Sequence, residues 1–269
     1  MKKGLIKTSQ EIETIAEGGK ILHDILHATA ELAKPGISTW QLNEFAEKAI
    51  YGTGGPFSNI QGRPEPGRMG GRPSFKNFGG KKNPFPAGLC TSVNSVVVHG
   101  IPSRSVILKD GDIISLDIGM EYKGLFTDTA ITVGVGKISD IAKKLIETTR
   151  KSLSAAIGQA KAGNTIGDIA YATQKTAEAA GFSVIRDLVG HGVGYEVHED
   201  PAVPNYGKKG QGIKLLEGMV LAIEPMVCEH EYFVVLDNDG WTIRTRDNGL
   251  AAHFEHTIAI TKNGARILT

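Results

Sequence analysis

The feature that most constrains the fold of this chain is an internal repeat. Four short segments of the first half recur, in the same order, in the second half of the 269 residues. The pairs are 34–39 with 161–166, 97–102 with 196–201, 110–117 with 217–224, and 128–132 with 255–259. Each similarity is weak alone, but the shared order indicates a duplication with approximate two-fold symmetry. We therefore expect two related halves that contribute to one curved sheet.

Hydrophobic spacing predicts the elements of each half. Apolar residues recur at three- and four-residue steps, as in helices, over 9–33, 37–51, 139–160 and 165–180. Segments rich in Ile, Val and Thr predict strands at 89–98, 112–121, 126–134, 184–190, 219–228, 232–236, 241–245 and 255–261. A helix pair followed by strands, occurring twice, favours an α+β fold over alternating βαβ units. The expected structure is a curved antiparallel sheet covered by two helix pairs, in one domain over 1–269.

One segment, 53–86, interrupts this regularity. It contains eight Gly, six Pro, six Lys or Arg and a single acid, Glu65. Such a composition buries too little apolar surface to offset the entropy of ordering the chain. The segment is expected to be a flexible insertion.

Overall composition gives no support to several classes of partner. Basic and acidic residues nearly cancel (30 − 29 = +1), which gives no argument for DNA or a membrane surface. Lys2 and Lys3 are not followed by the apolar run of a signal peptide, and no stretch of about 20 apolar residues occurs. Cys90 and Cys228 are too few for a disulfide framework. A cytoplasmic protein with reduced thiols is expected.

Four acidic residues lie in the apolar centres of predicted strands: Asp117, Asp128, Glu224 and Glu255. A turn near Gly124 would bring Asp117 and Asp128 to the same face, because side chains alternate along a strand. Burying an unpaired carboxylate costs several kcal/mol, and these strands contain no Lys or Arg. Metal ions are the expected partners. The alternative is that all four are ordinary solvent-facing strand residues.

His191 adds a nitrogen ligand to this set. It stands between Gly190 and Gly192, which allow close approach of the backbone. Five ligands, mostly oxygen, suit two divalent ions, and Mn, Fe, Co and Zn all accept such a site. Two ions about 3.5–4 Å apart share a water, lower its pKa and stabilise both sides of a displacement, and aminopeptidases are a known example of such centres. The pattern predicts a two-metal hydrolytic centre.

His99 and His198 are the other repeated pair. Each precedes a Pro by two or three residues, which predicts a strand end or turn. A histidine there can donate a hydrogen bond to a substrate carbonyl or to its oxyanion, and the alternative is a packed structural histidine. The remaining histidines have no comparable setting, although His256 is placed beside Glu255 to orient it. No His-Glu-x-x-His or Gly-x-Ser-x-Gly segment occurs, which excludes those two hydrolase plans.

The five ligand candidates, in this order, resemble the ligand set of the pita-bread metallopeptidases. Segments 94–102, 190–194, 223–226 and 254–258 are most similar to the methionine aminopeptidases. The likeness runs from about residue 6 to residue 260, interrupted only by 53–86. Prolidases and aminopeptidases P of this family carry a sizeable N-terminal domain, which is not expected here because the likeness begins at about residue 6. His191 and Glu224 are close in sequence (224 − 191 = 33), which resembles the short bacterial first type without a helical insertion.

The resemblance implies a role for each ligand candidate. Asp117 would chelate one ion, Asp128 and Glu255 would bridge both ions, and His191 would bind the other ion together with Glu224. Glu224 would also carry the proton from the attacking water to the leaving amine. The activity implied is removal of the N-terminal Met from nascent proteins and peptides with a small second residue.

The resemblance also implies the residues that contact substrate. His198 would meet the scissile carbonyl, His99 the scissile amide, and Cys90 and Trp241 would line an apolar pocket for the flexible thioether. The family's short aromatic-Gly segment before the Cys is stretched here, so that Phe75, Phe78 or Phe85 supplies the remaining wall. Leu188 and Val197 stand where some relatives have aromatic rings. A monomer is the family default.

Two rival functions and one partner remain open. The rivals are a related pita-bread aminopeptidase of other specificity and a non-catalytic binding module on the same fold. The Arg-bearing segment 53–86 suggests a transient ribosome contact through rRNA phosphates, against the alternative of a solvated insertion.

Overall fold

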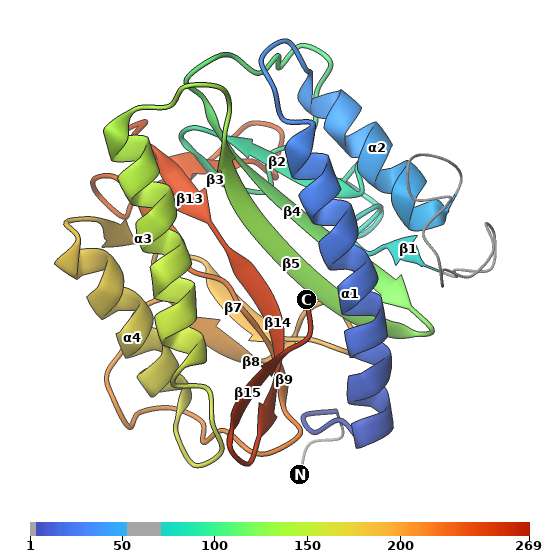
Figure 1. Cartoon of the computed structure of the whole chain (residues 1–269), viewed down its shortest axis with the longest axis vertical. Helices are drawn as coiled ribbons and strands as arrows, with labels where there is room; N and C mark the ends of the chain where they lie inside the picture. Colours follow the sequence, from blue (N-terminus) through green and yellow to red (C-terminus); the bar gives the residue numbers. More distant parts are fainter. Residues whose placement is uncertain (1–3, 53–70) are drawn as a thin grey trace.

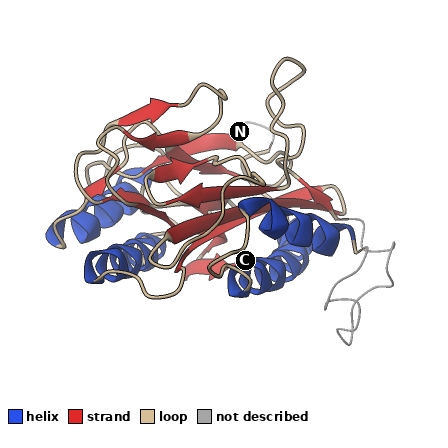
Figure 2. Ribbon diagram, turned by 90° about the horizontal axis from the view of Figure 1, so that it is seen from above, coloured by secondary structure: helices blue, strands red, loops and turns tan. Residues whose placement is uncertain are grey.

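The computed structural model of the chain describes residues 4–52 and 71–269. Four helices lie on one face of a large sheet, as Figures 1 and 2 show. They are α1 (Ser9–Glu31), α2 (Thr39–Tyr51), α3 (Asp140–Ile157) and α4 (Ile166–Ala179). All four predicted helices are thereby confirmed, with ends that differ by at most three residues. The first 18 residues of the predicted insertion, 53–70, lie outside the described residues.

The strands form one large sheet and two small ones. The large sheet contains β1 (Arg72–Pro73), β2 (Leu89–Val93), β4 (Ile113–Tyr122), β5 (Leu125–Gly134), β7 (Val189–Gly192), β8 (Glu199–Pro204), β9 (Val220–Ile223), β14 (Glu255–Thr261) and β15 (Gly264–Ile267). The small sheets contain β6 (Ser183–Val184), β10 (Met226–Cys228) and β13 (Ala251–His253), and β3 (Val96–Val98), β11 (Val234–Leu236) and β12 (Ile243–Thr245).

The order of strands in the large sheet displays the duplication directly. β5 and β14 pair at its centre, β4 and β9 flank them, and β2 and β7 pair with those in turn. Every pairing among these strands is antiparallel. α1 and α2 cover one half and α3 and α4 cover the other (Figure 1). The predicted α+β architecture with internal two-fold symmetry is confirmed.

Two helix starts follow from local sequence. Thr8 precedes α1 and forms a capping box with Glu11, and Ser38 precedes α2 and forms one with Gln41. A capping box satisfies backbone N–H groups that have no partner inside the helix. α2 ends at Gly52, whose φ of 69° is the left-handed conformation that glycine adopts without steric cost.

Each helix pair is attached to the sheet by its own apolar cluster. The cluster under α1 and α2 includes Leu22, Ile25, Leu26, Leu42, Ile50, Ile114, Leu116 and Ile118. The cluster under α3 and α4 includes Leu153, Ile169, Leu215, Leu221, Ile223 and Ile258. Burying one such side chain contributes about 1.5–3 kcal/mol relative to its exposed state. The helices therefore cover one face of the sheet, and Asp117, which alternates with Leu116 and Ile118 along β4, points to the other.

Several predicted strands were too long. Segment 89–98 splits into β2 and β3 at Asn94, whose φ of 53° makes a turn. Segment 219–228 splits into β9 and β10 beside Pro225, which cannot donate a ladder hydrogen bond. Segment 184–190 is irregular between β6 and β7, and β8, β13 and β15 were missed. Residues 71–86 were expected to belong to a flexible insertion, but they include β1, which pairs with β4.

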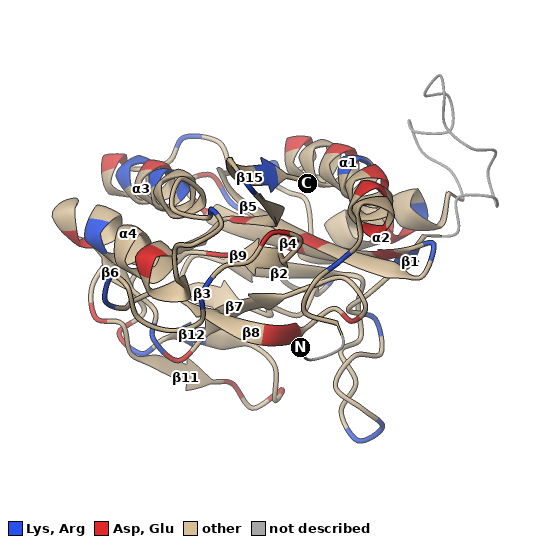
Figure 3. Cartoon of the chain, turned by 90° about the horizontal axis from the view of Figure 1, so that it is seen from below, with Lys and Arg blue, Asp and Glu red and all other residues tan. Residues whose placement is uncertain are grey.

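The outer surface carries both signs of charge. Acidic and basic residues both occur along α1 and α3 (Figure 3), and they form ion pairs such as Lys20–Asp24 and Arg150–Glu147. Exposed pairs of this kind contribute little to stability. Among the helices that the structure describes, none is both long and apolar enough to cross a membrane.

Candidate active site

Strand register places the acidic residues on one face of the large sheet. Asp117 on β4 and Glu255 on β14 both stand opposite Ala130 of β5, so these three residues form one cross-strand row. Asp128 stands opposite Gly119, two residues from Asp117, and side chains two apart share a face. The expectation that Asp117 and Asp128 point the same way is confirmed.

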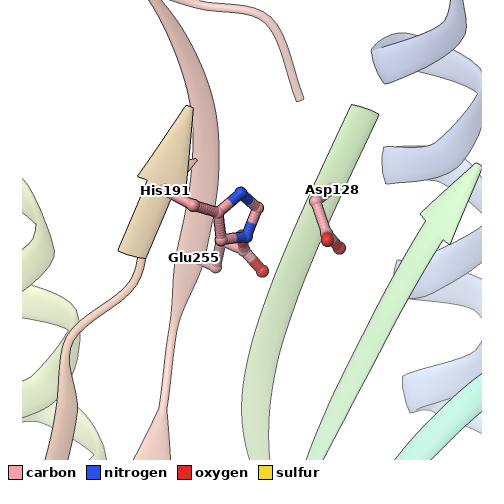
Figure 4. Close-up of side chains that lie close together, drawn as sticks. All are labelled: Asp128, His191 and Glu255. Carbon is pink, nitrogen blue, oxygen red and sulfur yellow. The ribbon is translucent and has the colours of Figure 1, made fainter. Parts of the chain in front are cut away.

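Three ligand candidates come together in the middle of this face. Single ligand atoms of Asp128, His191 and Glu255 all lie within 4.8 Å of one another, and Figure 4 shows the three side chains converging from β5, β7 and β14. Nδ1 of His191 lies 2.9 Å from the carbonyl oxygen of Gly192. A carbonyl oxygen only accepts, so Nδ1 carries the proton and Nε2 keeps its lone pair for a metal.

Asp117 and Glu224, the other two predicted ligands, lie beside this cluster. Both line the same cavity as the three convergent residues, although neither belongs to the 4.8 Å cluster. Glu224 directly follows β9, and its Oε1 lies 3.4 Å from Nε2 of His191. The structure thus brings all five predicted ligand residues to one cavity.

Burial makes this group of acids unfavourable without a cation. Burial raises the pKa of Asp117 to about 7, and the same cause raises the pKa values of Asp128 and Glu255 well above their usual range. The negative charges of the neighbouring carboxylates act in the same direction on Asp128 and Glu255. Oδ1 of Asp117 and Oε1 of Glu255 have no hydrogen-bond partner among the described residues. Buried oxygen and imidazole donors without partners fit divalent metal ions.

His253 is the residue that sequence reasoning missed. It is 1% exposed, and its Nε2 lies 3.3 Å from Oε2 of Glu224, within ion-pair distance. Neither ring nitrogen has a hydrogen bond of good geometry to another described residue. Burial opposes charge on His253, but contact with Glu224 outweighs it and raises the pKa of the imidazole. Its position two residues before Glu255 was the available signal, because alternate residues share a face.

Glu224 differs from the other acids because histidines surround it. Burial acts to raise the pKa of its carboxyl group, but contact with His253 and the nearby His191 and His198 outweigh burial, and the pKa is lowered. Glu224 is therefore the carboxylate of this site that most readily stays ionised. His256 does not orient Glu255 as expected, because it points to the opposite face and its Nδ1 lies 3.2 Å from Oγ1 of Thr269.

His99 and His198 both line the cavity. The rings of His198 and His191 are in edge contact, with centroids 4.4 Å apart. Burial is the main cause that lowers the pKa of His198 to about 4, and the neighbouring His191 acts in the same direction. Burial also lowers the pKa of His99. Both imidazoles are neutral near pH 7, a state in which a ring N–H can donate to a carbonyl oxygen.

The far end of the cavity is apolar. Cys90 and Trp241 line the cavity as expected, and so do all three aromatic candidates, Phe75, Phe78 and Phe85. Burial is the main cause that raises the pKa of Cys90, and the negative charge of Asp117 acts in the same direction. The thiol is therefore neutral and packs as an apolar group. Leu188 lines the cavity, whereas Val197 packs behind this wall. An apolar end beside a polar centre suits one unbranched apolar side chain.

The raised carboxyl pKa values predict how metal affects stability. A carboxyl group whose pKa is higher in the folded state stabilises below its unfolded pKa, and loses that contribution as the pH rises through about 7 for Asp117. Metal-free protein should therefore lose stability between pH 5.5 and pH 8, and added Mn²⁺ should restore it mainly at pH 8. We expect Mn²⁺ to raise Tm by at least about 4 °C at pH 8 and by less at pH 5.5, measured by scanning calorimetry. A gain that is equal at both pH values, or larger at pH 5.5, would contradict the metal assignment.

Comparison with known proteins agrees with this geometry. The model of metallopeptidase family M24 matches residues 13–262. The methionine aminopeptidase of Clostridium acetobutylicum is 44% identical over 265 residues, with 98% of each chain covered. Methionine aminopeptidase 1 of Bacillus subtilis is also 44% identical, over 98% of each chain. The crystal structure of the Thermotoga maritima methionine aminopeptidase superposes with a TM-score of 0.88 at 43% identity, again covering 98% of each chain.

Sequence identity at this level over nearly the whole length shows shared ancestry, and the superposition shows the pita-bread fold. The cavity supplies the donors that a metallopeptidase needs, in the strands where the family model matches. The chain belongs to metallopeptidase family M24 and, within it, to the methionine aminopeptidases, which are metal-dependent hydrolases.

Proposed function

We propose that this protein removes the N-terminal Met from peptides and nascent proteins whose second residue is small. The observation that carries the proposal is the cluster of Asp128, His191 and Glu255 in a cavity that is also lined by apolar and aromatic residues. The full-length similarity to methionine aminopeptidases supports it.

The ligand set is proposed to hold two divalent ions. Asp117, Asp128, His191, Glu224 and Glu255 would hold these ions between them. Co, Mn, Fe or Zn suits four carboxylates and one imidazole. When bound, such ions supply a water of lowered pKa and neutralise negative charge that develops at the scissile carbonyl.

Glu224 is proposed to move the proton. It is the acid of the site whose pKa is lowered, so it is ionised and able to accept a proton from the attacking water. His253, 3.3 Å away, holds one of its oxygens, while the other faces His191 at 3.4 Å. The same carboxyl group then gives the proton to the leaving amine.

The two neutral histidines are proposed to contact the scissile peptide. His198 lies over His191 at the metal end, where its ring N–H can donate to the carbonyl oxygen. His99 lies nearer the apolar end, with its ring centroid 6.3 Å from that of Trp241, and would meet the scissile amide. The free α-amine of the substrate would lie near Asp117, which accounts for removal of one terminal residue.

The Met side chain is proposed to fill the apolar end between Cys90 and Trp241. Phe75 and Phe85 complete its wall, since both are buried and belong to one apolar cluster with Cys90. Initial rates on Met-Ala-Ser, Leu-Ala-Ser and Ala-Pro-Ala test the assignment. Cleavage of the Met peptide should exceed that of the Leu peptide by at least about 10-fold, the scale of discrimination in apolar pockets. Preferred cleavage of the Pro peptide would assign the protein to a related aminopeptidase instead.

The proposal extends to the organisation of the chain, its location and a partner. Residues 1–269 would act as a single catalytic domain in the cytoplasm, where nascent chains are available. Segment 53–86 would make a transient ribosome contact through rRNA phosphates. Deleting residues 56–74 tests that contact, and unchanged co-sedimentation with ribosomes at low salt would exclude it.

A further inference from the structure

Residues 74–86 form a folded loop on the site face of the sheet, which we call the aromatic flap. Three backbone hydrogen bonds define it, from Asn77 N to Phe85 O at 2.9 Å, from Phe85 N to Phe78 O at 2.8 Å, and from Phe78 N to Phe75 O at 2.9 Å. At its base Ser74 N donates to Gly119 O of β4 at 3.0 Å. The flap is therefore tied to the strand that carries Asp117.

The far end of the flap is attached to the turn that carries Trp241. The indole Nε1 of Trp241 donates to Asn83 O at 3.0 Å, and Asn83 Nδ2 donates to Asp239 O at 3.0 Å. A Cβ atom at Gly79, which has a φ of +89°, would lie 2.4 Å from the Trp241 ring. Only glycine permits this close approach, so the flap and the indole are fitted to each other.

The three aromatic residues of the flap have different surroundings. Phe75 and Phe85 are 8% and 2% exposed and form the buried wall of the apolar end. Phe78 is 41% exposed and stands at the rim of the cavity. Its ring is in edge contact with His198, with centroids 4.9 Å apart, and lies 6.5 Å from that of Trp241. Phe78 thus stands between the apolar end and solvent, next to the histidine assigned to the scissile carbonyl.

We propose that Phe78 limits the size of the second residue of the substrate. The inference rests on the proposed function: with Met in the buried end and its carbonyl at His198, the next residue must leave the cavity past His198. His198 also borders a second hollow, lined by Gly4, Leu5, Tyr195 and Glu196, through which the rest of the peptide can leave. The side chain of the second residue then meets the ring of Phe78. A small side chain fits beside that ring, and a long or branched one does not.

The test compares Phe78→Ala with two matched variants. Phe78→Tyr keeps the ring and its edge contact with His198. Phe233→Ala removes a ring that is 38% exposed and contacts Tyr232 and Arg246, away from the cavity residues. For each protein, kcat/KM is measured on Met-Ala-Ser, Met-Val-Ser and Met-Leu-Ser with Mn²⁺ added. Metal content and Tm are measured in parallel.

Phe78→Ala should raise the ratio of kcat/KM for Met-Leu-Ser to that for Met-Ala-Ser by about 10-fold or more, the scale of discrimination for one or two methylenes. Phe78→Tyr and Phe233→Ala should leave the ratio within about twofold of the parent. An unchanged ratio in Phe78→Ala, or an equal loss on all three peptides, would overturn the inference, since the ring would then only support His198. If the parent protein binds metal but releases no Met from any peptide, the proposed function itself fails, and this inference with it.

Discussion

Replacing Glu224 with Gln should lower kcat for Met-Ala-Ser by about 1,000-fold, within the range measured for loss of a positioned acid–base group. The amide keeps the shape of the side chain and one oxygen able to bind metal, but it cannot accept a proton. KM should change by less than about threefold, because the residues assigned to peptide binding remain. Steady-state kinetics in metal-replete buffer measures both quantities.

A neighbouring acid provides the matched control for this variant. Glu229 follows β10, and its Oε2 accepts a hydrogen bond from Leu250 N at 3.2 Å, outside the cavity. Glu229→Gln should retain the parent kcat. Near-parental turnover in Glu224→Gln with metal in excess would remove Glu224 from the proton-transfer step and leave it only the role of a ligand.

The second large effect is expected for His198→Ala, which should lower kcat by about 100-fold, the loss typical of one hydrogen-bond donor to a developing oxyanion. The imidazole, with a pKa of about 4, donates as a neutral group across the neutral pH range. The variant should keep its metal, because His191 and the carboxylates make the convergent cluster without His198.

The metal content of His198→Ala shows whether a loss of activity reflects a missing hydrogen-bond donor or a missing metal ligand. Elemental analysis of the dialysed protein should give equal metal in the parent, in His198→Ala and in the exposed control His230→Ala. Loss of both metals from His198→Ala alone would make His198 a ligand and overturn its assignment to the carbonyl.

The sequence predicts the parts of the fold that depend on the spacing of apolar residues and on the internal duplication. The four helices follow from apolar spacing and from the caps at Thr8 and Ser38. Alternation of side chains along β4 and β5 is enough to predict that Asp117 and Asp128 share one face. Because the repeat maps β4 onto β9 and β5 onto β14, the acids of the second half follow from those of the first.

The parts that were not predictable depend on contacts between distant segments. Alternation with Glu255 suggests only the face on which His253 lies; its contact with Glu224 depends on the pairing of β13 with β10, which sets Met226 opposite His253. Phe75 and Phe85 are buried and Phe78 is exposed because of the way residues 74–86 contact the turn at Trp241, which is far away in the sequence. Glycine- and proline-rich composition predicted a loop there but could not predict its docking.

The most direct test of a metal-dependent aminopeptidase is an assay of metal-stripped protein on Met-Ala-Ser, with Mn²⁺, Co²⁺, Fe²⁺ and Zn²⁺ added back singly and bound metal counted by elemental analysis. We expect no release of Met without metal, and activity that returns with at least one of these ions as up to two are bound. Release of Met by protein verified to be free of metal, or silence with every ion despite stoichiometric binding, would contradict it.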